Sequence, residues 1–105
     1  MPKNVVFTLE ALDDINNIIT YLKLEWGESV CQSFLFKLTS VRNIISEHPR
    51  IFSYHNKRKN IRKVAFAANR VLYYRNRRNI IEIMVVFDTR QNPRKLKSLL
   101  KNRIK

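Results

Sequence analysis

The feature that most restricts the fold is an eight-residue run, Ile80–Phe87, that contains one charged residue, Glu82. A short apolar run rich in β-branched residues is typical of a strand buried on both faces, which places it inside a sheet. The segment that follows, 88–93, is polar and carries Arg90 where the strand leaves the core. The sequence therefore predicts an interior strand that holds a cation at the edge of the sheet, where it can meet phosphate groups.

Two helices are predicted ahead of this strand. Apolar residues recur at spacings of three and four over 9–26 and again over 30–48, which is the period of an amphipathic helix. Thr8 is the expected N-cap of the first helix, and Gly27, the single glycine, is expected to form a left-handed cap at its end. Pro49 ends the second helix. Two helices joined at one glycine fold back as a hairpin.

The remaining segments predict strands at 4–7, 61–67 and 70–75, joined by short polar turns, with a loop over 49–60. A short basic amphipathic helix follows Pro93. The predicted fold is α+β: an N-terminal strand, a two-helix hairpin packed on a mainly antiparallel four-stranded sheet, and a short C-terminal basic helix. We expect a single domain over 1–105, with the strand end and basic tail of 85–105 included.

Strict alternation along the interior strand assigns its side chains to two faces. One set is expected to pack on the helical hairpin: Ile81, Ile83, Val85 and Phe87. The other is expected to face the basic loop, the basic tail and any bound partner: Ile80, Glu82, Met84 and Val86.

The net charge of +13 is concentrated in the second half of the chain. Residues 1–50 hold five basic and six acidic groups, whereas residues 51–105 hold sixteen basic and two acidic groups. A surface tuned for solubility usually mixes both signs. The asymmetry therefore indicates a surface that meets phosphates, acidic lipid or an acidic protein.

Several classes of site and location are disfavoured by composition. Cys31 is the only cysteine and there are two histidines, so we expect no disulfide and no metal site. One glycine leaves no glycine-rich phosphate loop, and no cofactor is expected. The apolar runs are shorter than the roughly 18 residues of a membrane span, and Met1–Asn4 lacks a signal-peptide layout. A reducing cytoplasm is the expected location.

The candidate functional residues are therefore cations and tyrosines on the predicted strands. They are Arg62, Lys63, Arg70, Tyr73, Tyr74, Arg75 and Arg90. They are either ordinary edge cations and core tyrosines, or a groove that clamps phosphates beside aromatic rings. Such a groove would cleave RNA without a metal if its cations stabilised the scissile phosphate while another group moved protons.

Four segments in this order resemble the RelE/ParE toxin superfamily, over roughly residues 4 to 96. They are Leu9–Ile15 (LEALDDI), Tyr21–Gly27 (YLKLEWG), Asn69–Arg75 (NRVLYYR) and Phe87–Pro93 (FDTRQNP). The resemblance implies a small basic toxin of a type II toxin–antitoxin, plasmid-stabilisation type system. Such a toxin inhibits bacterial growth and is neutralised by a cognate acidic antitoxin encoded beside it.

The superfamily contains two activities. RelE-like members are metal-independent endoribonucleases that cleave mRNA in the ribosome. On that reading the resemblance assigns catalytic roles to Lys63, Arg70 and Arg90. The C-terminal tyrosine of such enzymes falls near Leu96, which cannot transfer a proton.

ParE-like members instead inhibit DNA gyrase, and the long hairpin with Trp26 and Gly27 at its bend is closer to this branch. We therefore predict a ParE-like gyrase inhibitor, with a RelE-like mRNA interferase as the alternative. A non-toxic basic nucleic-acid-binding module is the further alternative. The predicted nucleic-acid- or target-binding residues are Arg62, Tyr74, Arg75 and Arg94.

Overall fold

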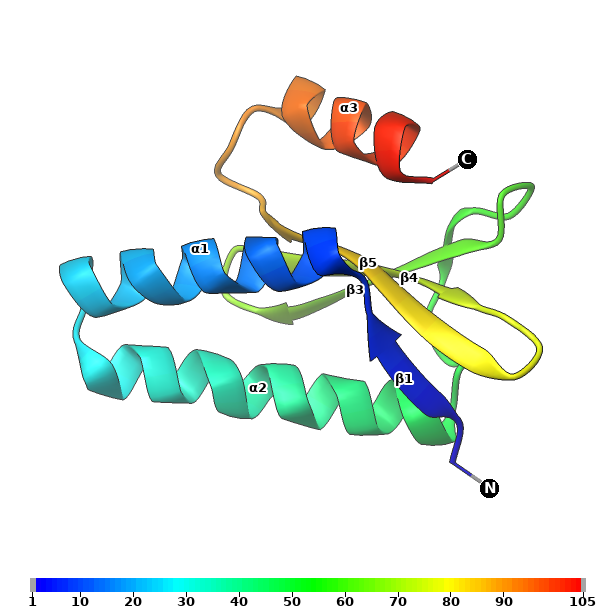
Figure 1. The fold of residues 1–105 in the computed structure, drawn as a ribbon, viewed down its shortest axis with the longest axis horizontal. Coiled ribbons are helices and arrows are strands. Elements are labelled where there is room, and N and C mark those ends of the chain that lie inside the picture. The colour runs from blue at the N-terminus through cyan, green and yellow to red at the C-terminus, as the bar shows by residue number, and fades with distance from the viewer. Residues whose placement is uncertain (1, 105) are drawn as a thin grey trace.

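A computed structural model describes residues 2–104, and Figure 1 shows how their helices and strands are arranged. Their order is β1 (Asn4–Phe7), α1 (Leu9–Glu25), α2 (Glu28–Glu47), β2 (Tyr54–Asn56), β3 (Ile61–Ala67), β4 (Arg70–Asn76), β5 (Ile80–Asp88) and α3 (Pro93–Arg103). The α+β class and the predicted succession of elements are confirmed. None of the helices in this part of the chain has the length and apolarity needed to cross a bilayer.

The ends of the helical hairpin follow the predicted signals. The Thr8 hydroxyl accepts a hydrogen bond from the Ala11 N–H at 3.1 Å, which caps the start of α1. Gly27 has the positive φ expected of a glycine at the bend, +90°, but its ψ of 176° is extended, so it is the N-cap of α2, and Trp26 is the C-cap of α1. Residues other than glycine rarely adopt the backbone conformation of Gly27. Pro49 lies just beyond α2, which ends at Glu47.

The sheet is mixed, with the strand order β1-β5-β4-β3-β2. β1 runs parallel to β5, and the other neighbours are antiparallel. β5 is an interior strand, and Ile81 and the run 83–87 are buried, as the apolar run predicts. The sheet has five strands where the sequence predicts four. The additional strand is β2, which lies within the predicted loop 49–60. It pairs over only Tyr54 and Asn56 and its register is irregular, so it left no alternating pattern in the sequence.

A bulge interrupts β5 where it pairs with β4. Tyr73 lies opposite Val85, whereas the next residue, Tyr74, lies opposite Ile83. Met84 is therefore an extra residue in β5. A bulge of this kind inverts the alternation of all side chains that follow it.

The bulge corrects the predicted faces of β5. Ile81 and Ile83 do pack in the core beneath the hairpin, as predicted. Val86 joins that core instead of the opposite face, while Val85 and Phe87 turn away from the hairpin. The prediction was wrong for these three residues because strict alternation allows no extra residue.

The second face of the sheet meets the basic tail, as predicted, but the tail covers it and leaves no open face there for a partner, which is a further correction. α3 lies against it, on the side opposite the hairpin (Figure 1). Leu96, Leu99 and Leu100 pack on this face, and Ile104 is 1% exposed. The C-terminal basic helix is thus docked through its apolar stripe, and its cations are exposed except for Arg103, which is partly buried.

Candidate functional site

A cleft of about 470 Å³ opens between α1, α3 and the C-terminal end of β5. Its polar lining consists of Asp14, Asn17, Tyr21, Arg70, Asp88, Arg90, Gln91, Lys95 and Arg103. The cleft contains two of the three predicted catalytic residues, Arg70 and Arg90. It also contains carboxylates that the sequence did not single out.

Asp88, at the end of β5, bridges Arg70 and Arg90. The strand register sets Arg70 directly opposite Asp88, and its Nη1 lies 3.2 Å from Oδ2 of that carboxylate. Arg90 donates to the same carboxylate through its backbone N–H at 2.9 Å, its Nε at 3.1 Å and its Nη2 at 2.8 Å. The Arg70 side chain is 5% exposed and that of Arg90 is 47% exposed. The two cations and the carboxylate together carry one net positive charge.

These contacts hold the pKa of Asp88 below its usual range. The main cause is the hydrogen bond from the Arg90 side chain, which outweighs the opposing effect of burial. The same bond raises the pKa of Arg90. Asp88 is therefore ionised at neutral pH and competes with any external anion for both guanidinium groups. Within residues 2–104, the buried Nε of Arg70 has no hydrogen-bond partner.

A second ion pair, Asp14 with Arg103, joins α1, β5 and α3 at the base of the cleft. The Nη1 and Nη2 atoms of Arg103 donate to the two carboxylate oxygens of Asp14 at 2.7 and 3.0 Å. Asp14 also accepts from the Val86 N–H at 3.0 Å, and Arg103 donates to the Met84 carbonyl at 3.2 Å. β1 pairs with β5 only as far as Ile83. Beyond that point, the ion pair supplies the hydrogen-bond partners of the Met84 carbonyl and the Val86 N–H. Neither Asp14 nor Asp88 is left as a free general base.

Lys63, the third predicted catalytic residue, lies outside this cleft. It pairs with Tyr73, three residues along β4 from Arg70, a separation of about 10 Å along the strand. Lys63 shares the α3 face with Tyr73, whereas Arg70 lies on the hairpin side, 6.0 Å from the Phe34 ring. The structure does not bring Lys63 together with Arg70 and Arg90.

His55 lies near enough to Lys63 to feel its charge. Its ring packs edge-on against Tyr73, with 5.1 Å between ring centres. Partial burial is the main cause that lowers the pKa of His55, and the charge of Lys63 lowers it further. This histidine is therefore mostly neutral at pH 7, on a different face of the sheet from the two arginines.

Two of the predicted target-binding residues have internal partners. Arg62 Nη1 donates to the Phe52 carbonyl at 2.7 Å, and its guanidinium lies 3.8 Å from the centre of the Tyr54 ring. Tyr74 is fully buried, and its hydroxyl donates to the Pro49 carbonyl at 2.8 Å. Both side chains fix the segment that follows α2. Tyr74 belongs to the core and is not part of an exposed surface.

The other two predicted target-binding residues lie nearer the surface and far apart in the fold. Arg75 is half-buried near the β4–β5 turn and donates to the Lys59 carbonyl at 3.2 Å. Arg94 is exposed in the first turn of α3, beside the cleft residue Lys95. Leu96, at the position predicted to lack a proton-transfer group, packs on the sheet beneath α3.

Large apolar side chains are exposed around the α1–α2 bend, next to the cleft. Leu24 is 80% exposed and Trp26 is 61% exposed. Tyr21 lines the cleft, and its ring lies 5.9 Å from the Arg90 guanidinium. Exposed aromatic and aliphatic groups beside an arginine are typical of a protein interface.

Sequence reasoning missed Asp14 and Arg103. Acidic residues are common near the start of a helix and cations are abundant in the C-terminal segment, so residue type alone sets neither Asp14 nor Arg103 apart. One signal was available, because Asp14 precedes the core residue Ile15 and lies one turn before Ile18, on the side of α1 that faces the sheet. Among the described residues no group of His, Cys, Asp or Glu is arranged to hold a metal ion.

Comparison with known proteins places the chain in a family. Residues 5–93 match a family model described as "ParE toxin of type II toxin-antitoxin system, parDE". A solved structure described as "Chromosomal ParDE TA system from P. aeruginosa" is similar, with a TM-score of 0.71 at 10% identity, over 82% of this chain and 95% of that chain. No curated protein matches in sequence. The structural likeness supports the fold, the family match confirms the predicted ParE-like resemblance, and the chain belongs to the ParE family of type II toxin–antitoxin toxins.

Proposed function

We propose that this toxin stops bacterial growth by blocking DNA gyrase. The observation that carries the proposal is the placement of the three predicted catalytic cations. Arg70 and Arg90 share the carboxylate of Asp88, and Lys63 lies on the other face of the sheet. Cleavage of RNA needs cations that converge on one phosphate and a group that transfers protons. This arrangement supports binding in preference to catalysis.

The surface around the hairpin bend supports a protein as the target. Trp26 and Leu24 project from the bend, and Arg90 and Arg94 lie on the stretch from the end of β5 to the start of α3. We propose that the apolar groups anchor gyrase and that the two arginines meet its acidic side chains. Truncating an aromatic anchor of this kind to alanine weakens binding by about 2 kcal/mol or more.

A side-by-side assay of gyrase supercoiling and translated mRNA cleavage tests the proposal. The purified toxin is expected to block supercoiling and to leave ribosome-bound mRNA intact. Absence of a block at about micromolar toxin, together with cleavage that Arg70→Ala and Arg90→Ala abolish, would instead assign the RelE-like ribonuclease activity. Circular dichroism of both variants shows whether the fold is retained.

A matched pair of variants tests the target surface. Trp26→Ala at the bend is expected to raise the toxin concentration needed for half-maximal block by about thirtyfold. Phe36→Ala is the control, because Phe36 is also an exposed aromatic residue, at 73%, but lies further along α2. Equal effects of the two substitutions would reject the bend as the gyrase contact.

We also propose that a cognate acidic antitoxin binds this toxin in the cytoplasm and restores growth when the two are co-expressed. The excess of basic residues in 51–105 supports electrostatic steering of such a partner. The association rate is expected to fall steeply with salt, with a smaller effect on dissociation. An association rate that does not change with salt would contradict this part of the proposal.

A further inference from the structure

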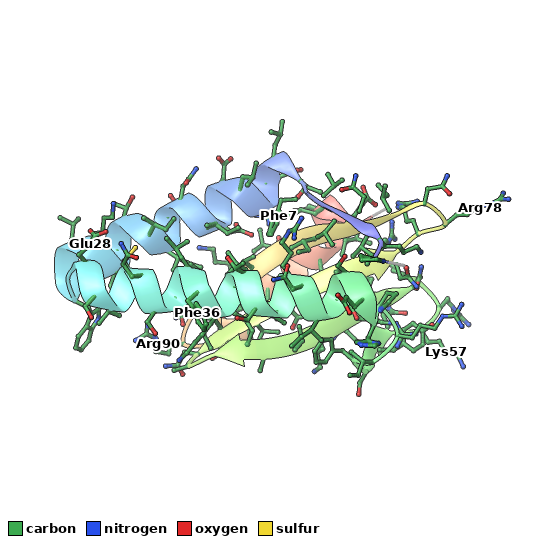
Figure 2. All side chains as sticks on the ribbon, turned by 90° about the horizontal axis from the view of Figure 1, so that it is seen from below. Phe7, Glu28, Phe36, Lys57, Arg78 and Arg90 are labelled. Atoms are coloured by element: carbon green, nitrogen blue, oxygen red, sulfur yellow. The ribbon has the colours of Figure 1, made fainter. Side chains whose placement is uncertain are left out.

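Two turns at one end of the molecule carry a group of cations that the cleft does not use. The β2–β3 turn contributes Lys57, Arg58 and Lys59, and the β4–β5 turn contributes Arg77 and Arg78. Figure 2 shows Lys57 and Arg78 projecting at the end opposite to Glu28 and Arg90. We call this set of five residues the turn cluster.

The turn cluster is held in place by hydrogen bonds between and within the turns. The Asn60 side chain donates to the Asn76 carbonyl at 3.0 Å, which ties the first turn to the second. Within the first turn the Lys59 N–H donates to the Asn56 side chain at 3.1 Å, and Asn60 adopts a left-handed φ of 58°. Lys3, just before β1, extends the tie, because its Nζ donates to the Asn76 side chain and to the Arg77 carbonyl. These bonds fix the backbone of both turns, so the positions from which the cations project are set before any ligand binds.

Few acidic groups offset these charges. Glu82 pairs with Arg77, and it is the only acidic residue in the segments 57–62 and 75–82. Over residues 2–104, no carboxylate lies within ion-pair distance of Lys57, Arg58, Lys59 or Arg78. This contrasts with the cleft, where Asp14 and Asp88 form ion pairs with the neighbouring arginines. Like charges held close together repel one another, and an external polyanion would relieve that repulsion.

We propose that the turn cluster binds the phosphate backbone of duplex DNA. The two turns join strand pairs that are two positions apart in the sheet, so their centres lie about 10 Å apart. That separation is close to the width of the major groove of B-DNA, about 12 Å. Residues 57–60 and 76–79 contain no aromatic residue, so the turns lack the stacking platforms that recognise single-stranded nucleic acid.

DNA binding is a further activity beyond the proposed block of gyrase. Because gyrase itself holds DNA, a toxin that binds both would recognise the enzyme together with its substrate. Only this last link rests on the proposed function. Binding of DNA by the toxin alone is measured without gyrase. A toxin that binds duplex through the turns but leaves supercoiling unaffected would remove the proposed target and keep this inference.

The test measures binding of a labelled duplex of about 20 base pairs by fluorescence anisotropy, between about 50 and 200 mM salt. Four exposed cations that neutralise about four phosphates predict a slope near −3.6 for log affinity against log salt. K57Q/R58Q/K59Q is expected to reduce that slope to about −1 and to weaken binding at least tenfold. Arg58→Gln with Arg78→Gln is a second variant, which takes one cation from each turn.

The matched control is K23Q/K37Q/K97Q, which removes the same charge from exposed positions on the three helices. Its affinity is expected to stay within about twofold of the wild type. Equal losses in the two triple variants would overturn the proposal, because net charge alone would then explain binding. Tighter binding of single-stranded RNA of equal length would overturn the commitment to duplex DNA. No binding of the duplex by the wild type at about 50 mM salt would point to a protein partner and would also overturn it.

Discussion

Loss of the Asp14 carboxylate should destabilise the whole fold, because this one side chain joins three elements. Asp14→Ala removes the ion partner of Arg103 and leaves the Val86 N–H without its acceptor. Breaking a buried ion pair costs about 3–5 kcal/mol, and an orphaned buried N–H costs about 1–3 kcal/mol. The two side chains keep 14% and 15% exposure, so water offsets part of the charge penalty. We expect the free energy of unfolding to fall by about 3 kcal/mol.

Urea unfolding followed by circular dichroism measures this loss, and thermal unfolding should show a fall in Tm of more than about 10 °C. Arg103→Ala is expected to cost less, because Asp14 keeps the Val86 N–H and can reach water. The double variant Asp14→Ala with Arg103→Ala should cost little more than Asp14→Ala alone, with a coupling energy above about 1 kcal/mol.

Asp13→Ala is the matched control, since Asp13 is the exposed neighbour of Asp14 on α1. It should change stability by no more than about 0.5 kcal/mol. The reasoning is refuted if Asp14→Ala costs no more than this control, or if the losses in the two single variants simply add in the double variant. Either result would mean that the bulge in β5 holds without the ion pair.

Three further predictions concern single positions. Gly27→Ala should cost about 1–3 kcal/mol through backbone strain alone, because an added Cβ would meet no atom within 4 Å; an unchanged Tm would contradict this. Tyr74→Phe should cost about 1–2 kcal/mol through the lost bond to the Pro49 carbonyl. In an absorbance titration, the variant should also lack the tyrosine that ionises at the highest pH, because burial raises the pKa of Tyr74 to about 12. Asp88→Asn should make the free energy of unfolding depend less on pH in the acid range. The pKa of Asp88 is lowered in the folded state, so its contribution is present above the ordinary carboxyl pKa of about 4 and is lost as pH falls through the lower folded value. The gap between wild type and variant should therefore close in acid, and a constant gap would refute the assignment.

Local signals predicted much of this fold. Thr8, Gly27 and Pro49 act within a few residues of their own positions, and each marks a helix boundary as expected. The bulge at Met84 is different in kind. The groups around it bond to Asp14, 72 residues away from Val86, and to Arg103. No periodicity within β5 encodes such partners, so a prediction of strict alternation failed after that residue.

The same limit applies to charge. The sequence located the basic excess correctly in residues 51–105, but a count of charges does not say which cations are already neutralised. Strand register brings Asp88 against Arg70, and the turn that follows brings Arg90 to the same carboxylate. Two of the three cations that seemed most suited to chemistry, Arg70 and Arg90, therefore already have an internal partner. Lys57, Arg58 and Lys59, which were read only as part of a loop, lie where no acidic residue of the described chain reaches them. Such a cation contributes more to capturing a polyanion than one already held by a carboxylate, because no internal partner has to be displaced before it can bind.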